Sequence, residues 1–120
     1  DKSEITNKTD REPASDEYSI PKEKLTSYLL NPEHPVGKHK ARVFKAALGY
    51  ELDNWEELMH NILQNIDKTK MIQTETSAYG IKYNCDVTLK GLNGKEATVR
   101  TTWIVETGTD RYRLVTAIVL

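Results

Sequence analysis

The sequence is poor in cysteine and has no long apolar segment. Its 120 residues include one cysteine, Cys85, which excludes an intramolecular disulfide framework and a zinc site built on cysteines. No apolar run approaches the roughly 18 residues that a membrane-spanning helix needs. No segment has the basic start and apolar centre of a signal peptide. The length of 120 residues fits one domain, and these absences indicate that it has no membrane-spanning segment.

Motifs for nucleotide and metal binding are also missing. The chain contains no GxGxxG, no GxxxxGK[ST] and no HExxH sequence. A zinc site built from His34, His39 and His60 would need distant parts of the chain to converge, and no spacing supports it. We therefore expect no cofactor and no bound metal ion.

Charge is nearly balanced over the whole chain but segregated along it. The 17 basic and 18 acidic residues exclude a simple polybasic binder. Residues 22–48 hold 6 basic and 2 acidic residues, whereas residues 49–67 hold 5 acidic and no basic residues. A neutral protein with segregated charge can carry a local anion-binding face. The alternative is that these charges form ordinary solvated surfaces.

Residues 1–18 are polar and show no periodicity, so they cannot bury enough apolar surface to offset the entropy of ordering. We predict a flexible linker or arm there and one domain over residues 19–120.

Three helices are expected, over about 19–30, from the turn at 35–37 to 48, and over 53–66. The expected signals are helix ends at Asn31-Pro32 and at Gly49, a capping box formed by Asp53 and Glu56, and buried stripes that include Leu25, Tyr28, Leu29, Ala41, Phe44, Leu48, Trp55, Leu58, Met59, Ile62 and Ile66.

After Asp67 the hydrophobic period changes from 3.6 to 2, which predicts strands over about 71–77, 81–90, 97–105 and 111–120. The predicted fold is therefore α+β, with N-terminal helices packed on one face of a four-stranded antiparallel meander sheet. The alternation makes Cys85 a core residue.

Burial sets the register of the two hairpins. A three-residue loop over 92–94 pairs Leu89 with Ala97 and Tyr83 with Trp103, whereas a two-residue loop would mix the two faces. Gly94 then takes the left-handed position of a bulge. A four-residue loop over 107–110 pairs Glu106 with Arg111, and the core face then receives Tyr112, Leu114, Thr116, Ile118 and Leu120.

The opposite face of the predicted sheet is polar. A cluster of guanidinium, amide and hydroxyl groups can bind phosphate, because guanidinium offers a planar fork of donors. The alternative is a solvated β face with no ligand. The residues expected on this open face are Lys82, Asn84, Asp86, Thr88, Arg100, Thr102, Ile104, Arg113 and Val115.

A second cluster occupies the turn before the second helix, Glu33-His34-Pro35-Val36-Gly37-Lys38-His39-Lys40. Backbone N–H groups at a helix N-terminus bind anions, and the lysines add positive charge. The first turn of a helix usually carries acids, so the basic residues here favour a functional reading. Alternatively, these side chains face water as ordinary turn residues.

The runs KLTSYLLNPEHPVGKHKARVFKAALGY, ATVRTTWIV and RLVTAIVL resemble a small family of uncharacterised bacterial domains over about residues 22–120. Such domains lie at the C-terminal ends of large secreted proteins, including contact-dependent growth inhibition and other polymorphic toxins. The residues that carry the resemblance are His34, Pro35, Gly37, Lys40, Ala41, Phe44, Thr101, Trp103, Leu114 and Thr116.

The order of helices and strands also resembles the barnase–EndoU–colicin–RelE toxin-nuclease fold. The resemblance implies a metal-independent ribonuclease that activates an RNA 2′-hydroxyl to attack the adjacent phosphodiester. The open face shows no glutamate in the place of a barnase-like base and no histidine, so any histidine must come from the helix turn. The roles expected are His34 or His39 as acid or base, Lys40 and Arg100 on phosphate with Arg113 as a further clamp, Thr102 and Thr116 orienting the scissile group, and Lys38 and Lys82 binding substrate.

By the register above, Thr116 lies on the core side and reaches the site only if its strand bulges. The resemblance implies transfer RNA as substrate, a cognate immunity protein as partner, and secretion within a larger protein that acts in the cytoplasm of a target cell. An alternative is a non-catalytic immunity protein or adaptor whose partner surface is the acidic stretch 51–67. A DNase is disfavoured, because no cluster of carboxylates with histidine suggests a metal-dependent site.

Overall fold

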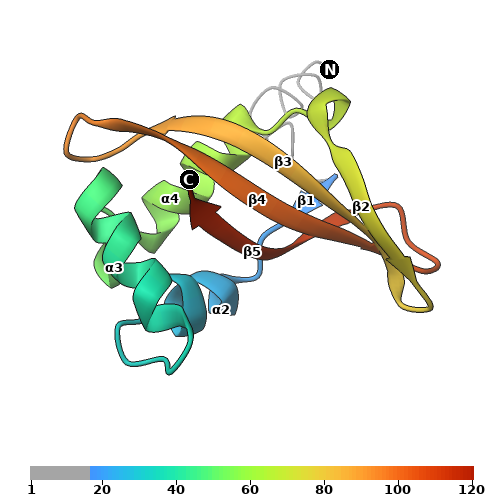
Figure 1. Cartoon of the computed structure of the whole chain (residues 1–120), viewed down its shortest axis with the longest axis horizontal. Coiled ribbons are helices and arrows are strands. Elements are labelled where there is room, and N and C mark those ends of the chain that lie inside the picture. Colours follow the sequence, from blue (N-terminus) through green and yellow to red (C-terminus); the bar gives the residue numbers. More distant parts are fainter. Residues whose placement is uncertain (1–16) are drawn as a thin grey trace, which may run out of the picture.

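The computed structural model describes residues 17–120, in which helices cover one face of a five-stranded sheet of order β1-β5-β4-β3-β2 (Figure 1). This architecture confirms the α+β class. The four expected strands are present, and the fifth strand, β1, pairs parallel with β5 through only two residues. The elements are β1 Tyr18–Ser19, α2 Lys22–Lys24, η1 Leu25–Leu29, α3 Gly37–Leu48, η2 Leu52–Asn54, α4 Trp55–Asn65, η3 Lys68–Lys70, β2 Ile72–Ser77, β3 Gly80–Lys90, β4 Glu96–Glu106 and β5 Tyr112–Val119.

The folded part begins earlier than predicted. Tyr18 is only 6% exposed, and its ring stacks on Tyr112 and meets Trp103 edge to face. The backbone N–H of Tyr112 donates to the carbonyl oxygen of Glu17 at 2.8 Å. Glu17 and Tyr18 therefore belong to the domain and not to an arm. The rest of the predicted arm, residues 1–16, lies outside the described residues.

The first predicted helix forms as two consecutive parts. The short α2 runs directly into the π-helix η1, where the backbone N–H of Leu30 donates to the carbonyl oxygen of Leu25 at 2.9 Å. Leu25 and Leu29 are buried as expected, and the helix ends before Asn31-Pro32. The wider π turn is the part that periodicity did not predict.

The two later helices differ in how well their ends were predicted. Gly49 ends α3 in the left-handed conformation, with φ +78°, which confirms its predicted role. The capping box at the start of the next helix was placed wrongly. Glu51 and Asn54 form it around the 3-10 turn η2, in place of Asp53 and Glu56.

The register of the central hairpin is confirmed. Leu89 pairs with Ala97 and Tyr83 with Trp103, so β3 and β4 turn their apolar sets to the same face. Gly94 has φ +85° in the loop that joins them. Cys85 is buried on that face, and its Sγ lies 3.7 Å from the carbonyl oxygen of Asp67.

The register predicted for the second hairpin is confirmed from the turn to the pair of Trp103 with Leu114, and it is wrong beyond a bulge in β5. Trp103 pairs with Leu114 but Thr102 pairs with Thr116, so one extra residue, Val115, is inserted in the strand. The inserted residue reverses the faces after it, because side chains alternate along a strand. Thr116 therefore joins Thr102 on the open face. Ala117 turns to the core in place of Ile118 and Leu120, which are 45% and 61% exposed.

The core-facing side of the sheet contains one polar chain. The Trp103 indole N–H donates to the Thr101 hydroxyl at 2.7 Å, and that hydroxyl donates to the carbonyl oxygen of Cys85 at 2.7 Å. Both side chains are fully buried, and each donor has a partner. This chain fixes the Trp103 ring against the helices.

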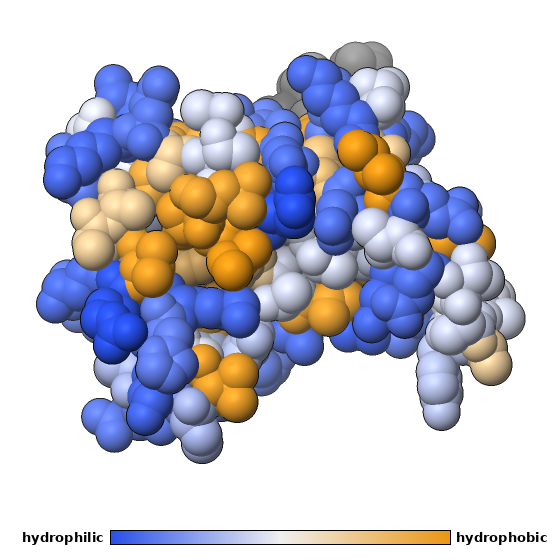
Figure 2. Space-filling view, in the orientation of Figure 1, coloured by the Kyte–Doolittle hydropathy of each residue, from blue (hydrophilic) through white to orange (hydrophobic). Residues whose placement is uncertain are grey.

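Apolar side chains also gather on the surface. Figure 2 shows an apolar area over α3 and the C-terminal end of β5, surrounded by hydrophilic residues. Val43, Ile118 and Leu120 are exposed in these two elements. Among the described helices, none is long and apolar enough to cross a membrane.

Candidate functional site

A cleft of about 620 Å³ lies where the first helix meets the open face of the sheet beside β5. It combines residues from α2 and η1, the turn before α3, and the bulged strand. One carboxylate, one phenol, one imidazole and two cationic groups are therefore close together. The cleft residues are Pro21, Glu23, Lys24, Ser27, Tyr28, His34, Arg113, Val115 and Thr116.

Tyr28 occupies a central place among the cleft residues. Its ring meets the His34 ring edge to face, with centroids 5.1 Å apart and planes at 73°. The Lys40 Nζ lies 5.7 Å and the Lys24 Nζ 6.0 Å from the centroid of the Tyr28 ring. An aromatic ring attracts such cations through the negative charge of its face. The phenol is thus held between an imidazole and two ammonium groups.

These neighbours change the acidity of Tyr28. Burial raises its pKa, but the Thr116 hydroxyl and the Lys40 ammonium together lower it by more, and the pKa falls below its ordinary value. The Thr116 oxygen is buried and makes no hydrogen bond of good geometry within residues 17–120, yet it lies close enough to favour the phenolate. Tyr28 gives up its proton more readily than a solvent-exposed tyrosine does.

His34 is oriented by the start of α3. Its Nδ1 accepts the backbone N–H of Val36 at 3.0 Å and that of Gly37 at 2.8 Å. A nitrogen that accepts two hydrogen bonds carries no proton, so the ring proton sits on Nε2. His34 therefore satisfies two orphan donors of the helix and keeps an Nε2–H donor.

The turn and the first helix approach each other closely at Gly37. A Cβ at this position would lie 2.2 Å from the carbonyl oxygen of Tyr28 and 2.8 Å from its ring. Only glycine allows the backbone of α3 to come this near. Gly37 thus positions His34 beside Tyr28.

The structure brings some of the predicted residues together. His34, Arg113 and Thr116 line the cleft, and Lys40 reaches the Tyr28 ring from α3. The Arg113 Nη2 donates to Glu106 at 2.7 Å, which leaves its other N–H groups for a ligand.

Other predicted residues do not line the cleft. The His39 Nδ1 is 3.2 Å from the Arg42 Nη2 on an exposed helix face. Lys38 lines a different hollow together with Arg42 and Lys45. Lys82 is not among the residues that line the cleft.

Arg100 was expected on phosphate but is already paired with a carboxylate. It forms a bidentate ion pair with Asp86, with Nε–Oδ1 at 2.8 Å and Nη2–Oδ2 at 3.0 Å. The pair lowers the pKa of Asp86 and raises that of Arg100 through this hydrogen bond and the attraction of the two charges. Arg100 lines a second hollow on the open face, and Thr102 lies between this hollow and the cleft.

The chain matches the family described as Domain of unknown function (DUF6883) over residues 11–120. The chain belongs to this family. Its fold is similar to a chain of the contact-dependent growth inhibition toxin–immunity protein complex from Klebsiella pneumoniae 342. The TM-score is 0.64 at 17% identity, over 84% of this chain and 98% of the other. At this identity the likeness shows a shared fold. No curated protein matches the sequence.

Six cleft residues of this DUF6883 domain were not predicted as site residues, and three of these six carry ionisable groups: Glu23, Lys24 and Tyr28. Tyr28 fits the spacing of a buried stripe, and it does pack against the core. Nothing in the sequence separates a tyrosine that only packs from one whose hydroxyl reaches a cleft. Glu23 supplies the carboxylate that the sheet pattern had not placed near the open face.

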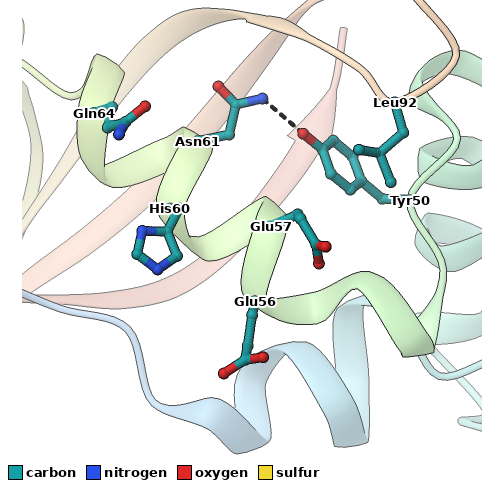
Figure 3. Close-up of a pocket in the computed structure, with 7 residues that line it drawn as sticks. All are labelled: Tyr50, Glu56, Glu57, His60, Asn61, Gln64 and Leu92. Carbon is teal, nitrogen blue, oxygen red and sulfur yellow. Dashed lines mark hydrogen bonds between the residues drawn. The ribbon is translucent and has the colours of Figure 1, made fainter.

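A further hollow of about 520 Å³ lies on the acidic face of α4 (Figure 3). Glu56, Glu57 and His60 line it from the helix, and Asn61 points toward Tyr50 in the close-up. The Asn61 Nδ2 donates to the Tyr50 hydroxyl at 2.7 Å and to the carbonyl oxygen of Lys90 at 2.9 Å. Within residues 17–120, no group of three His, Cys, Asp or Glu side chains is placed to hold a metal ion.

Proposed function

We propose that this domain is a metal-independent endoribonuclease toxin that cuts transfer RNA by attack of a 2′-hydroxyl on the adjacent phosphodiester. The observation that carries the proposal is the convergence of Glu23, Tyr28, His34, Arg113 and Thr116 on one cleft. Cleavage of RNA without a metal needs a base, an acid and cations for the phosphorane, and these groups supply all three.

Glu23 is the proposed base. Its carboxylate takes the proton of the 2′-hydroxyl while O2′ forms a bond to phosphorus. The bond between phosphorus and O5′ then breaks, leaving a 2′,3′-cyclic phosphate on one product. A carboxylate is the fitting base because it lies in the cleft beside the cations that hold the phosphate.

Tyr28 is the proposed acid, which gives its phenolic proton to the departing O5′. Lys40 and Thr116 lower the pKa of Tyr28 and so stabilise the phenolate that forms as the proton leaves. Thr116 then orients the phenol beside the scissile bond. The bulge at Val115 is what gives Thr116 this place.

We assign His34 the role of a hydrogen-bond donor, in place of the acid or base role expected from the sequence. Because Nδ1 accepts two backbone N–H groups, the neutral ring offers Nε2–H and cannot take a proton there. His34 and Arg113 therefore hold non-bridging phosphate oxygens, and Lys24 and Lys40 add positive charge. His39, Lys38 and Arg100 lie outside this arrangement.

We infer the biological setting from the resemblance, and the shared fold supports it. The neighbouring structure is a contact-dependent growth inhibition toxin–immunity protein complex. On this basis the domain is delivered as the C-terminal part of a larger secreted bacterial protein and acts in the cytoplasm of a target cell. A cognate immunity protein with an acidic patch would then cover the basic cleft.

The test is cleavage of total RNA by the purified chain in buffer containing EDTA. We expect discrete transfer RNA fragments from the wild type. His34→Ala should slow cleavage by at least about tenfold, because it removes one donor to the phosphate. His39→Ala is the matched control and should cleave at the wild-type rate. Absence of cleavage with and without added divalent metal would overturn the proposal.

A second candidate function is a non-catalytic immunity protein or adaptor. It is favoured by the acidic face of α4, where Glu56 and Glu57 line a hollow (Figure 3), and by the shared fold with a chain from a complex that contains both kinds of protein. Expression in a bacterial cytoplasm separates the two functions. A nuclease toxin stops growth, whereas an immunity protein or adaptor is harmless.

A further inference from the structure

The second hollow on the open face has the chemistry of a base-binding site. It encloses about 360 Å³ and is lined by Lys70, Ile72, Asn84, Asp86 and Arg100. We propose that this hollow binds the nucleobase of a nucleotide that flanks the scissile bond, and that it selects guanine and uracil, whose O6 and O4 carbonyl oxygens stand where adenine carries its amino group, over adenine. This inference rests on the proposed ribonuclease function.

The hollow and the cleft are joined by one row of residues across the sheet. Thr116 pairs with Thr102, and Thr102 with Asn84. Asn84 in turn pairs with Ile72. Directly paired residues share a face, so all four side chains line one path. Three steps of about 4.8 Å separate the ends of this row by about 14 Å, which leaves room for a second nucleotide beside the cleft.

Ile72 gives the hollow an apolar wall. It is 68% exposed on an edge strand, where nothing in the described fold covers it. A base buries its flat apolar face readily against such a side chain, whereas a free phosphate gains no favourable contact with an apolar group. This contact distinguishes a nucleobase site from a plain anion site.

The polar groups of the hollow are mainly donors. The Thr102 hydroxyl donates to the Asn84 Oδ1 at 2.9 Å, so the amide keeps its NH₂ group for another partner. The Arg100 guanidinium uses two N–H groups on Asp86 and retains others. Donors of this kind pair with the carbonyl oxygens of guanine and uracil, and they face the amino group of adenine unfavourably.

Asp86 holds the guanidinium in place. The bidentate pair fixes the Arg100 plane, as it does wherever arginine reads a planar partner. In this proposal the ion pair orients Arg100 to bind the edge of a base, and Arg100 does not bind phosphate. Exchanging a donor for an acceptor at Asn84 should then remove the preference for guanine and uracil over adenine.

The experiment uses DNA oligonucleotides that contain one ribonucleotide, so that only one bond can be cut. The base of that ribonucleotide and the base that follows it are each varied among guanine, uracil, adenine and cytosine. We expect the wild type to cut its guanine or uracil substrates at least about tenfold faster than adenine at one of the two positions. Asn84→Asp should remove this preference while retaining the rate on the adenine substrate, and Ile72→Ala should slow all four.

Thr88→Ala, on the same face and outside the hollow, is the matched control and should keep the preference. An unchanged preference in Asn84→Asp, or no preference in the wild type, would overturn the base-binding site while leaving the ribonuclease intact. If the wild type cuts no RNA, the proposed ribonuclease function is wrong, and the base-binding site must be tested by binding alone. Binding is then read separately from the Asn84 side-chain amide signals in NMR spectra, which GMP or UMP should shift and AMP should not; no shift with any of them rejects the site.

Discussion

The rings of Tyr28 and His34 meet edge to face with centroids 5.1 Å apart, one from η1 and the other from the turn before α3. Because His34 is held by the backbone N–H groups of α3, this contact ties the first helix to the second. Thr116 completes the arrangement from the sheet. Three separate segments thus define the geometry of the cleft.

Tyr28→Phe should abolish most cleavage without unfolding the protein. The change removes the proposed acid and keeps the aromatic ring that packs against the core. Loss of a general acid slows a reaction by about 10²- to 10⁴-fold. The measurement is the single-turnover cleavage rate, with circular dichroism as the check on folding. Tyr79→Phe, at an exposed hairpin, is the control; equal rates for Tyr28→Phe and the wild type would remove Tyr28 from the mechanism.

Lys40→Met should raise the pKa of Tyr28. The ammonium group is one of the two main causes that lower this pKa, and methionine keeps the length of the side chain without the charge. The difference between ultraviolet titrations of each protein and its Tyr28→Phe variant isolates one tyrosine. The pKa of Tyr28 should lie below the ordinary value for tyrosine in the wild type and closer to that value in Lys40→Met. Identical curves would show that Lys40 does not act on the phenol.

Much of the fold follows from the alternation of apolar residues. The pairings of Leu89 with Ala97 and of Tyr83 with Trp103 could be predicted, because any other register exposes an apolar set. The bulge at Val115 could not, since the sequence of β5 alternates equally well with or without it. Only packing against β4 and the helices decides that Ala117, and not Ile118, enters the core.

The candidate site was also predictable only in part. His34, Lys40 and Arg113 stand out by charge and position in the chain, so the sequence indicates them. His39 and Lys38 stand out equally, but His39 lies beside Arg42, Lys38 lines another hollow, and neither lines the cleft. Glu23 from α2 and Tyr28 from η1 become candidates only when the fold places them in one cleft with residues of β5.

Tyr18 predicts how stability depends on pH. Burial, with nearby negative charge from Glu17, raises the pKa of Tyr18 to about 12. The unfolded chain therefore releases this proton near pH 10, before the folded protein does, and the stabilisation present below pH 10 is lost as the pH rises toward 12. A shift of this size corresponds to about 3 kcal/mol. Urea unfolding at pH 9 to 12 should show a steeper loss in the wild type than in Tyr18→Phe, and parallel losses would contradict the assignment.

Gly37→Ala tests the close approach of α3 to η1. The added Cβ would overlap the carbonyl oxygen of Tyr28, which is backbone and cannot move away independently. We expect a loss of at least about 2 kcal/mol in the free energy of unfolding, together with reduced cleavage, since His34 shifts with the helix. Gly108→Ala is a control for backbone strain without a clash, because a Cβ there would meet open space while its φ of +88° disfavours any side chain. Unchanged stability in Gly37→Ala would mean that the two helices are not held this closely.

The chemistry of the cut ends tests the central claim most directly. Transfer RNA is incubated with the purified chain in EDTA, and the fragments are analysed by mass spectrometry and by ligation that requires a 5′-hydroxyl. The account predicts a 2′,3′-cyclic phosphate on one fragment and a 5′-hydroxyl on the other, both lost in Tyr28→Phe. Fragments that carry a 5′-phosphate, or ends that persist unchanged in Tyr28→Phe, would contradict it.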